Sequence, residues 1–261
     1  MITLSLATAC IVVYFWQDKI IFNPKKINPE GALPRPPELK RVGVKTSDGL
    51  DLQALYFPGD KTKPAVMWQH GNAYDIDQLG FVMKPYIDAK FPVYMTEYRG
   101  FGGNGGKLSE DGFINDIEAG WNFLKSRGHG DIVVHGFSMG CALSARFAAT
   151  RRTPHALVLE APFANLRSLI TQTRRKLLPA ARFLRYDMDT EKWVGRVNAP
   201  TLVVHGDSDR KVPVAGGRAV FDASAAAEKE MMVVQGGTHY LYQSGSIGPI
   251  MNWLRGLKCG R

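Results

Sequence analysis

The residues most clearly suited to catalysis are centred on Ser138, in the pentapeptide Gly136-Phe137-Ser138-Met139-Gly140. Just before it, Ile132 to Val134 are β-branched and apolar, which predicts a strand buried on both faces of a sheet. Just after it, Met139 to Ala148 is rich in alanine and other small residues and is predicted to be a helix. A G-x-S-x-G between strand and helix exposes the serine hydroxyl at the carboxyl edge of the sheet. The alternative is a glycine-flanked serine in an ordinary loop, and the flanking elements favour the nucleophile.

An alternation of predicted strands and helices must position Ser138. Further strands are predicted at 41–46, 50–57, 65–69, 92–97, 156–160, 201–205 and 231–234. Helical patterns run from Asp75 to Lys90 and from a cap at Ser109-Glu110-Asp111 to about Arg127. Ser47-Asp48-Gly49 is a hairpin signal between the first two strands. This alternation predicts a mostly parallel α/β sheet covered on both faces, in one body spanning residues 40–261.

Composition limits the partners. The 261 residues are 45% hydrophobic, enough for a large core, and carry a net charge of +9. The basic residues are spread out or gathered around 167–185 without a nucleic-acid-binding motif, so we expect no nucleic-acid partner. A soluble basic surface, or one that meets anionic lipid, is favoured instead. The three cysteines, Cys10, Cys141 and Cys259, offer neither a disulfide framework nor metal-ligand spacing. No metal or organic cofactor is implied, and the oligomeric state stays open.

The N-terminus begins with an apolar run, Ile2 to Trp16, of 15 uncharged residues. As a helix it would span about 22 Å, short of the roughly 30 Å hydrocarbon core of a bilayer. The run lacks the charged start and the A-x-A site that a cleaved signal peptide would have. A lipoprotein using Cys10 would interrupt the run early, with Ala7 where a large aliphatic residue is expected.

A short membrane anchor within residues 1–26 explains the run best. The aromatic cluster Tyr14-Phe15-Trp16, followed by lysines at 19, 25 and 26, suits a membrane interface and favours the cytoplasmic side for the body. Residues 27–39 hold four prolines and are predicted to be an extended tether. We therefore expect membrane association through a single N-terminal anchor.

Several motifs occur in an order that identifies a family. They are His70-Gly71-Asn72, Tyr98-Arg99-Gly100-Phe101-Gly102, the Ser138 pentapeptide, Glu160-Ala161-Pro162-Phe163, His205-Gly206-Asp207-Ser208-Asp209 with Val212-Pro213, and Gly236-Gly237-Thr238-His239. From about Arg41 to Leu257 the chain resembles the α/β-hydrolase superfamily. Within it, the chain is similar to the small, often membrane-anchored branch with depalmitoylating thioesterases and lipid hydrolases. The resemblance implies the α/β-hydrolase fold: a mostly parallel central sheet of about eight strands, flanking helices and a short helical lid.

A serine hydroxyl is a weak nucleophile at neutral pH and needs an imidazole to take its proton. The chain order of this fold is serine, acid, histidine, so the base lies after the acid. His239 follows two glycines in a loop after the last predicted strand and is the expected base, whereas His205 ends a buried strand and is interpreted as structural. Spacing alone leaves Asp207 and Asp209 both open as the acid, because residues two apart in an extended stretch share a side. The motif register of the resembling family selects Asp209.

The oxyanion hole of such a site needs two backbone N–H groups. The expected donors are Met139, at a helix N-terminus, and Asn72, in the loop after the third strand. His70 precedes the nucleophile and is interpreted as a buried scaffold residue. Tyr98 to Gly106 lacks the lysine and hydroxyl of a phosphate-binding loop and is predicted to pack beside the site. The resembling family usually has a small hydroxyl residue at the position of Asn104.

A lid region is expected at about residues 163–198, with room for two short helices. Its leucines and isoleucine at 166, 169, 170, 177 and 178 give an apolar face, and its basic residues at 167, 174, 175, 176, 182 and 185 give a charged one. Two interpretations stay open: an ordinary helix pair on the sheet edge, or a basic amphipathic lid held against a membrane.

The sequence thus predicts a serine hydrolase that cleaves a carboxylic ester or thioester, of a small molecule or an acyl chain, through an acyl-enzyme. Its site residues are Ser138, Asp209 and His239, with Asn72 and Met139 as the oxyanion hole. A peptidase of the same fold is the alternative within the enzymes, and a catalytically silent binding module is the alternative outside them.

Overall fold

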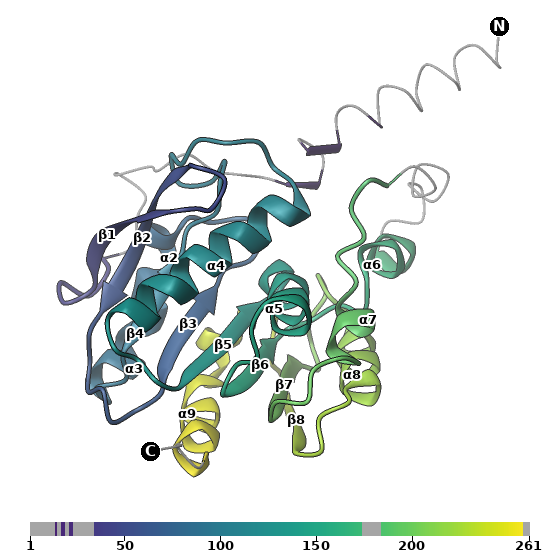
Figure 1. The fold of residues 1–261 in the computed structure, drawn as a ribbon. Coiled ribbons are helices and arrows are strands. Elements are labelled where there is room, and N and C mark those ends of the chain that lie inside the picture. Colours follow the sequence, from purple (N-terminus) through teal and green to yellow (C-terminus); the bar gives the residue numbers. More distant parts are fainter. Residues whose placement is uncertain (1–13, 15–16, 19–20, 23–33, 174–183, 258–261) are drawn as a thin grey trace, which may run out of the picture.

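The central feature of the molecule is one sheet, which Figure 1 shows in the order β1-β2-β4-β3-β5-β6-β7-β8. The computed structural model describes Tyr14, Gln17, Asp18, Ile21, Phe22 and residues 34–173 and 184–257. Its strands are β1 (Lys40–Lys45), β2 (Asp51–Phe57), β3 (Ala65–Gln69), β4 (Val93–Thr96), β5 (Ile132–Phe137), β6 (Ala156–Glu160), β7 (Thr201–Gly206) and β8 (Lys229–Val234). In the described sheet β2 pairs antiparallel with both β1 and β4, and the remaining strand pairs are parallel. The predicted α/β-hydrolase fold, with its mostly parallel sheet of about eight strands, is confirmed.

Helices cover both faces of the sheet. They are α2 (Ile76–Leu79), η1 (Gly80–Met83), α3 (Lys84–Asp88), α4 (Glu110–Ser126), α5 (Met139–Thr150), α6 (Leu166–Thr173), α7 (Thr190–Val194), α8 (Val214–Ala223), η4 (Leu241–Ser244) and α9 (Ile247–Gly256). Alternate residues of a strand point to opposite faces, so Val134 packs in the core under α4, α5, α7 and α8, and Val133 in the core under α2, α3 and α9. This two-sided burial explains the uninterrupted apolar run at the start of β5.

The helix predicted from Asp75 to Lys90 is instead three short segments, so that prediction is wrong in detail. Asp75 does cap the first of them, accepting a hydrogen bond from the Gln78 N–H at 2.9 Å. Pro85 then prevents a continuous helix, because its ring would collide with the carbonyl of Phe81 and it has no N–H to donate. The chain restarts as α3 with this proline in the first turn.

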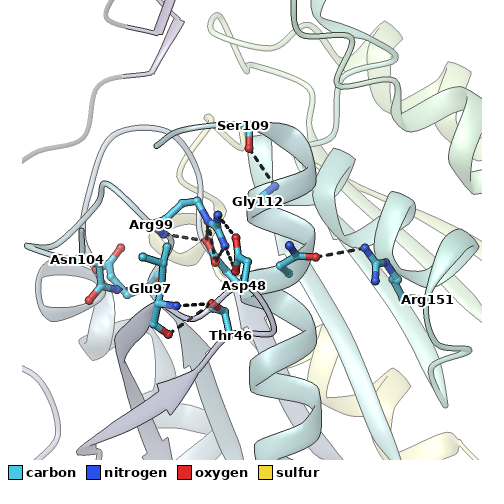
Figure 2. A network of polar contacts seen from close by, with 11 residues as sticks. Thr46, Asp48, Glu97, Arg99, Asn104, Ser109, Gly112 and Arg151 are labelled. Carbon is cyan, nitrogen blue, oxygen red and sulfur yellow. Dashed lines mark hydrogen bonds and ion pairs between the residues drawn. The ribbon is translucent and has the colours of Figure 1, made fainter. Parts of the chain in front are cut away.

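An ionic network around the buried Arg99 supports the loop between β4 and α4 (Figure 2). The Arg99 guanidinium bonds the carboxylates of Asp116, at 2.7 Å, and of Asp48, also at 2.7 Å. Burial raises the pKa of Asp116, against the opposing effect of Arg99, whereas the hydrogen bonds from Arg99 hold the pKa of Asp48 below its usual range. Arg99 thereby joins the β1–β2 hairpin to α4.

Asn104 fixes the same loop to the sheet. Its side-chain amide donates to the carbonyl of Glu97, the residue after β4, at 3.1 Å and accepts from the Gln53 N–H of β2 at 2.9 Å, so Asn104 joins the start of the loop to β2. The two bonds use both the N–H donor and the oxygen acceptor of the amide. A small hydroxyl residue can also donate and accept, but its side chain is shorter than that of asparagine. The departure from the family pattern therefore has a structural role in this chain.

The predicted anchor and tether lie largely outside the described residues. Within the part of the chain that the structure describes, no helix is long and apolar enough to cross a membrane. The lid positions at 174, 175, 176, 177, 178 and 182 also lie outside that part. The anchor, the tether and the basic lid face therefore stay predictions.

Candidate active site

Ser138 lies in the tight turn between β5 and α5. Its backbone has φ of 54° and ψ of −117°, a left-handed conformation that is unfavourable for a residue with a side chain. Its N–H donates to the Glu160 carbonyl at 2.8 Å, which fixes the turn against β6. A Cβ at Gly136 would lie 2.5 Å from the Gly140 carbonyl oxygen, and one at Gly140 would lie 2.2 Å from that of Gln69. The two glycines are therefore required by close backbone contacts, as expected from the motif.

His239 and Asp209 are in direct contact. The Nδ1 atom of His239, in the loop after β8, lies 2.7 Å from Oδ2 of Asp209, in the loop after β7. The Asp209 side chain is fully buried, and its Oδ1 accepts the N–H groups of Lys211 and Val212 at 2.8 and 2.9 Å. Burial raises the pKa of Asp209, but hydrogen bonds from His205 and His239 outweigh burial and hold the pKa well below its usual range. The carboxylate is therefore ionised and directed at the imidazole.

Asp207 is used differently from Asp209. Its exposed Oδ1 accepts the Gly236 N–H at 2.8 Å and the Ser208 hydroxyl at 3.0 Å, so it stabilises the turns at the ends of β7 and β8. His205 is buried in the sheet and pairs through Nε2 with the Val212 carbonyl at 2.9 Å. A Cβ at Gly217 would lie 2.4 Å from its Nδ1, which shows how closely α8 packs over this histidine.

The loop after β3 lies beside the Ser138 turn. A Cβ at Gly71 would lie 3.2 Å from the Cβ of Ser138. The absence of a side chain at Gly71 therefore lets the loop that holds Asn72 approach the turn at Ser138. Asn72 and Met139 border the same cavity as Ser138. His70 is fully buried, with Nε2 3.0 Å from Oε1 of Glu97, and anchors the base of the loop.

These residues open onto a cavity of about 720 Å³. Ser138 and His239 both line it, together with apolar residues of the lid and sheet edge: Phe163, Leu166, Leu169, Ile170, Met188 and Val212. Arg210 and Lys211 line it too, and the Lys211 ammonium donates to the Tyr240 hydroxyl at 2.8 Å. One side of the cavity is therefore apolar and another is cationic.

Sequence reasoning missed part of this cavity. Ile21 lines it from the N-terminal segment, and Tyr240 lies beside His239 with ring centroids 5.5 Å apart. The apolar positions 166, 169 and 170 of the lid had a recognisable pattern, whereas Ile21 had none, because its contact joins residues far apart in the chain. Arg210 and Lys211 could have been found from their place beside the Asp209 motif.

Cys141 is part of the core. It is fully buried, and its Sγ atom donates to the carbonyls of Gly136 and Glu160, both at 3.2 Å. Burial raises the pKa of its thiol well above the usual range, which removes the thiolate needed for reactivity. Among the described residues, no group of histidine, cysteine, aspartate or glutamate side chains is arranged to hold a metal ion.

Comparison with known proteins gives the class of protein that this fold and site define. A family model described as serine aminopeptidase, S33, matches residues 60–188. The uncharacterized protein Rv2307c of Mycobacterium tuberculosis (strain ATCC 25618 / H37Rv) is 31% identical over 242 residues, which cover 90% of this chain and 85% of that protein. The alpha/beta hydrolase domain-containing protein 17C of Xenopus tropicalis is 29% identical over 180 residues, covering 67% and 55% respectively.

Solved structures agree on the fold. The Pyrococcus furiosus esterase Pf2001, in space group P212121, matches with a TM-score of 0.71 at 18% identity, over 90% of this chain and 96% of that chain. The esterase EaEST from Exiguobacterium antarcticum matches with a TM-score of 0.67 at 13% identity, over 83% and 100%. The chain belongs to the α/β-hydrolase superfamily.

Proposed function

We propose that this protein is a serine hydrolase that cleaves carboxylic esters or thioesters through an acyl-enzyme intermediate. The observation that carries the proposal is the 2.7 Å contact between His239 Nδ1 and the buried Asp209 carboxylate, in a cavity that Ser138 shares. An imidazole held by its Nδ1 presents Nε2 as a free base, which is the arrangement that a serine nucleophile needs.

In the first half of the reaction, the Ser138 Oγ attacks the substrate carbonyl carbon while His239 Nε2 takes the hydroxyl proton. Asp209 stays ionised and stabilises the imidazolium that forms. The tetrahedral intermediate then collapses: the bond from carbon to the alcohol or thiol breaks, and His239 returns the proton to that leaving group. Ser138 now carries the acyl group as an ester.

In the second half, water replaces the leaving group. His239 takes a proton from the water as its oxygen attacks the acyl carbon, the bond to Ser138 Oγ breaks, and the serine recovers its proton from His239. Each tetrahedral intermediate carries a negative oxygen, for which the backbone N–H groups of Met139 and Asn72 are the proposed donors. One such donor is worth roughly 10²–10³ in rate in enzymes of this type.

The cavity lining favours an acyl ester over a peptide with a free amino terminus. An aminopeptidase must hold the substrate's ammonium group, and a carboxylate is the usual partner for such a charge. The described lining residues include no aspartate or glutamate, whereas Arg210 and Lys211 supply positive charge. The apolar side offers space for an acyl chain. A silent binding module would have no need for an ionised acid paired with the histidine.

We also propose that the apolar run before Gln17 attaches the protein to a membrane, with the body on the cytoplasmic side. The support is the sequence of that run and its aromatic and lysine flank. Fractionation of cells expressing the full chain tests it: recovery in the soluble fraction without detergent would contradict the proposal.

The central experiment compares Ser138→Ala with Ser126→Ala, an exposed serine on α4 whose hydroxyl bonds the Phe123 carbonyl. Both variants are assayed with p-nitrophenyl esters from acetate to palmitate, and both are treated with a fluorophosphonate probe. Ser138→Ala is expected to keep the wild-type melting temperature, lose probe labelling and retain only slow residual turnover. Ser126→Ala is expected to match the wild type. Normal labelling of Ser138→Ala would show that the nucleophile is another residue.

A further inference from the structure

Gln17, Asp18, Ile21 and Phe22, the described residues of a short N-terminal segment, contact the hydrolase domain. Phe22 is 1% exposed and belongs to the core beneath α4. Its ring makes edge-to-face contacts with Phe113 of α4, at 5.4 Å between centroids, and with Tyr186 of the lid region, at 4.7 Å. Burial of an aromatic side chain of this size contributes roughly 2 kcal/mol or more to stability, so Phe22 holds the segment in one position on the domain.

Polar contacts join the same segment to Arg185 and Tyr186 of the lid region. The Tyr186 hydroxyl donates to Asp18 Oδ1 at 2.6 Å, and the Arg185 N–H donates to Gln17 Oε1 at 2.7 Å. The Arg185 guanidinium also pairs with Asp18. Burial and the hydrogen bond to Asp18 raise the pKa of Tyr186, so the phenol stays protonated and remains a donor.

Ile21 brings this segment into the site itself. Its side chain lines the cavity that Ser138 and His239 share. Its carbonyl accepts a hydrogen bond from the side-chain amide of Asn72, a residue 51 positions later. Asn72 is the residue whose backbone N–H is the proposed second oxyanion donor. One side-chain bond therefore connects the N-terminal segment to the loop that must hold the oxyanion.

We infer that Gln17, Asp18, Ile21 and Phe22 form a positioning segment of the active site. Through the Ile21 carbonyl the segment fixes the Asn72 loop, and through Gln17, Asp18 and Phe22 it is itself fixed to α4 and the lid region. This inference rests on the proposed function, because it concerns the stabilisation of an oxyanion. Donors act on the rate only when they are aligned in advance with the transition state. Loss of the bond to Ile21 should therefore lower kcat more than it raises KM.

The test compares Asn72→Ala with Asn115→Ala in the full chain. Asn72→Ala keeps the backbone N–H but removes the bond to Ile21, whereas Asn115 lies on α4 and bonds Arg151 at the surface. A net hydrogen bond of roughly 1 kcal/mol corresponds to about fivefold in rate, so kcat of Asn72→Ala is expected to fall about fivefold. A trifluoromethyl ketone, which forms a charged hemiketal with an active serine, is expected to bind about fivefold more weakly. KM and melting temperature should stay near the wild-type values, and Asn115→Ala should change none of these quantities.

Unchanged kcat and inhibitor affinity in Asn72→Ala would overturn the inference, as would a rise in KM alone. A truncation pair gives an independent readout: removal of residues 1–13 should keep kcat, and removal of residues 1–22 should lower it. Full activity after removal of residues 1–22 would also overturn the inference. If that truncation fails to fold, the Asn72→Ala measurements decide. Failure of the proposed function is seen separately, as turnover and labelling that survive in Ser138→Ala.

Discussion

Replacing Asp209 by asparagine changes one terminal atom of a buried side chain and tests the proposed mechanism. Asparagine can keep its Oδ1 on the N–H groups of Lys211 and Val212, which fixes the amide nitrogen at the position of Oδ2, beside His239 Nδ1. An amide nitrogen there donates rather than accepts, so Nδ1 must become the acceptor and the ring proton moves to Nε2. That tautomer cannot take the proton of Ser138. The expected loss is on the order of 10⁴ in kcat, or about 5.4 kcal/mol of transition-state stabilisation.

The matched control is Asp207→Asn. The Asp207 Oδ1 accepts two hydrogen bonds at the surface, and an asparagine oxygen can accept both, so kcat should change by less than about threefold. Steady-state kinetics with p-nitrophenyl acetate, with melting temperatures to show folding, measures both variants. Retention of kcat within tenfold in a folded Asp209→Asn variant would refute the tautomer argument. A larger loss in Asp207→Asn would assign the acid role to Asp207.

Three further outcomes are expected. Because the pKa of Asp209 is lowered from its usual 3.8, its ionised form stabilises the fold above that pH, and this stabilisation is lost as the pH falls through the folded-state pKa. Thermal unfolding between about pH 5 and pH 2 should therefore show a steeper loss of stability for the wild type than for Asp209→Asn, and equal slopes would contradict this role of the Asp209 carboxylate. In a Cys10→Ser, Cys259→Ser variant, iodoacetamide at about pH 8 should label Cys141 only after unfolding in guanidinium, since burial raises the pKa of its thiol; rapid native labelling would oppose this. Ile170→Trp, which narrows the cavity, should lower kcat/KM for the palmitate ester at least about tenfold and spare the acetate ester, so an equal loss for both would show that the acyl chain lies elsewhere.

Local sequence patterns were enough to predict the sheet and the tight turn at Ser138. The apolar start of β5 and the glycines around Ser138 depend on neighbours within a few residues, and backbone contacts at Gly136 and Gly140 explain why these residue types are needed there. The contact between Asp209 and His239 joins two loops at the carboxyl ends of adjacent parallel strands, β7 and β8. The order of motifs suggested His239 and an aspartate of the loop after β7, and the register of the resembling family then selected Asp209.

The three-part break between Asp75 and Lys90 was missed, although Pro85 within an otherwise helical pattern is a local signal for it. The contacts of the N-terminal segment, in contrast, could not be predicted from local patterns. Residues Gln17 and Asp18 contact the chain 168 and 167 residues later, at Arg185. The spacing of residues in a short N-terminal segment does not predict such a distant contact, because the contact depends on how the completed sheet and helices pack.

The left-handed backbone at Ser138 has a consequence for how this protein would change under selection. A residue with a side chain held at a positive φ costs of order 1–3 kcal/mol, and glycine relieves most of that cost. A thermostability screen that ignores turnover is therefore expected to enrich glycine at position 138. A position where mutation stabilises the chain would then be the one that the proposed activity requires, so an evolved heat-stable variant should be sequenced at position 138 before its activity is interpreted.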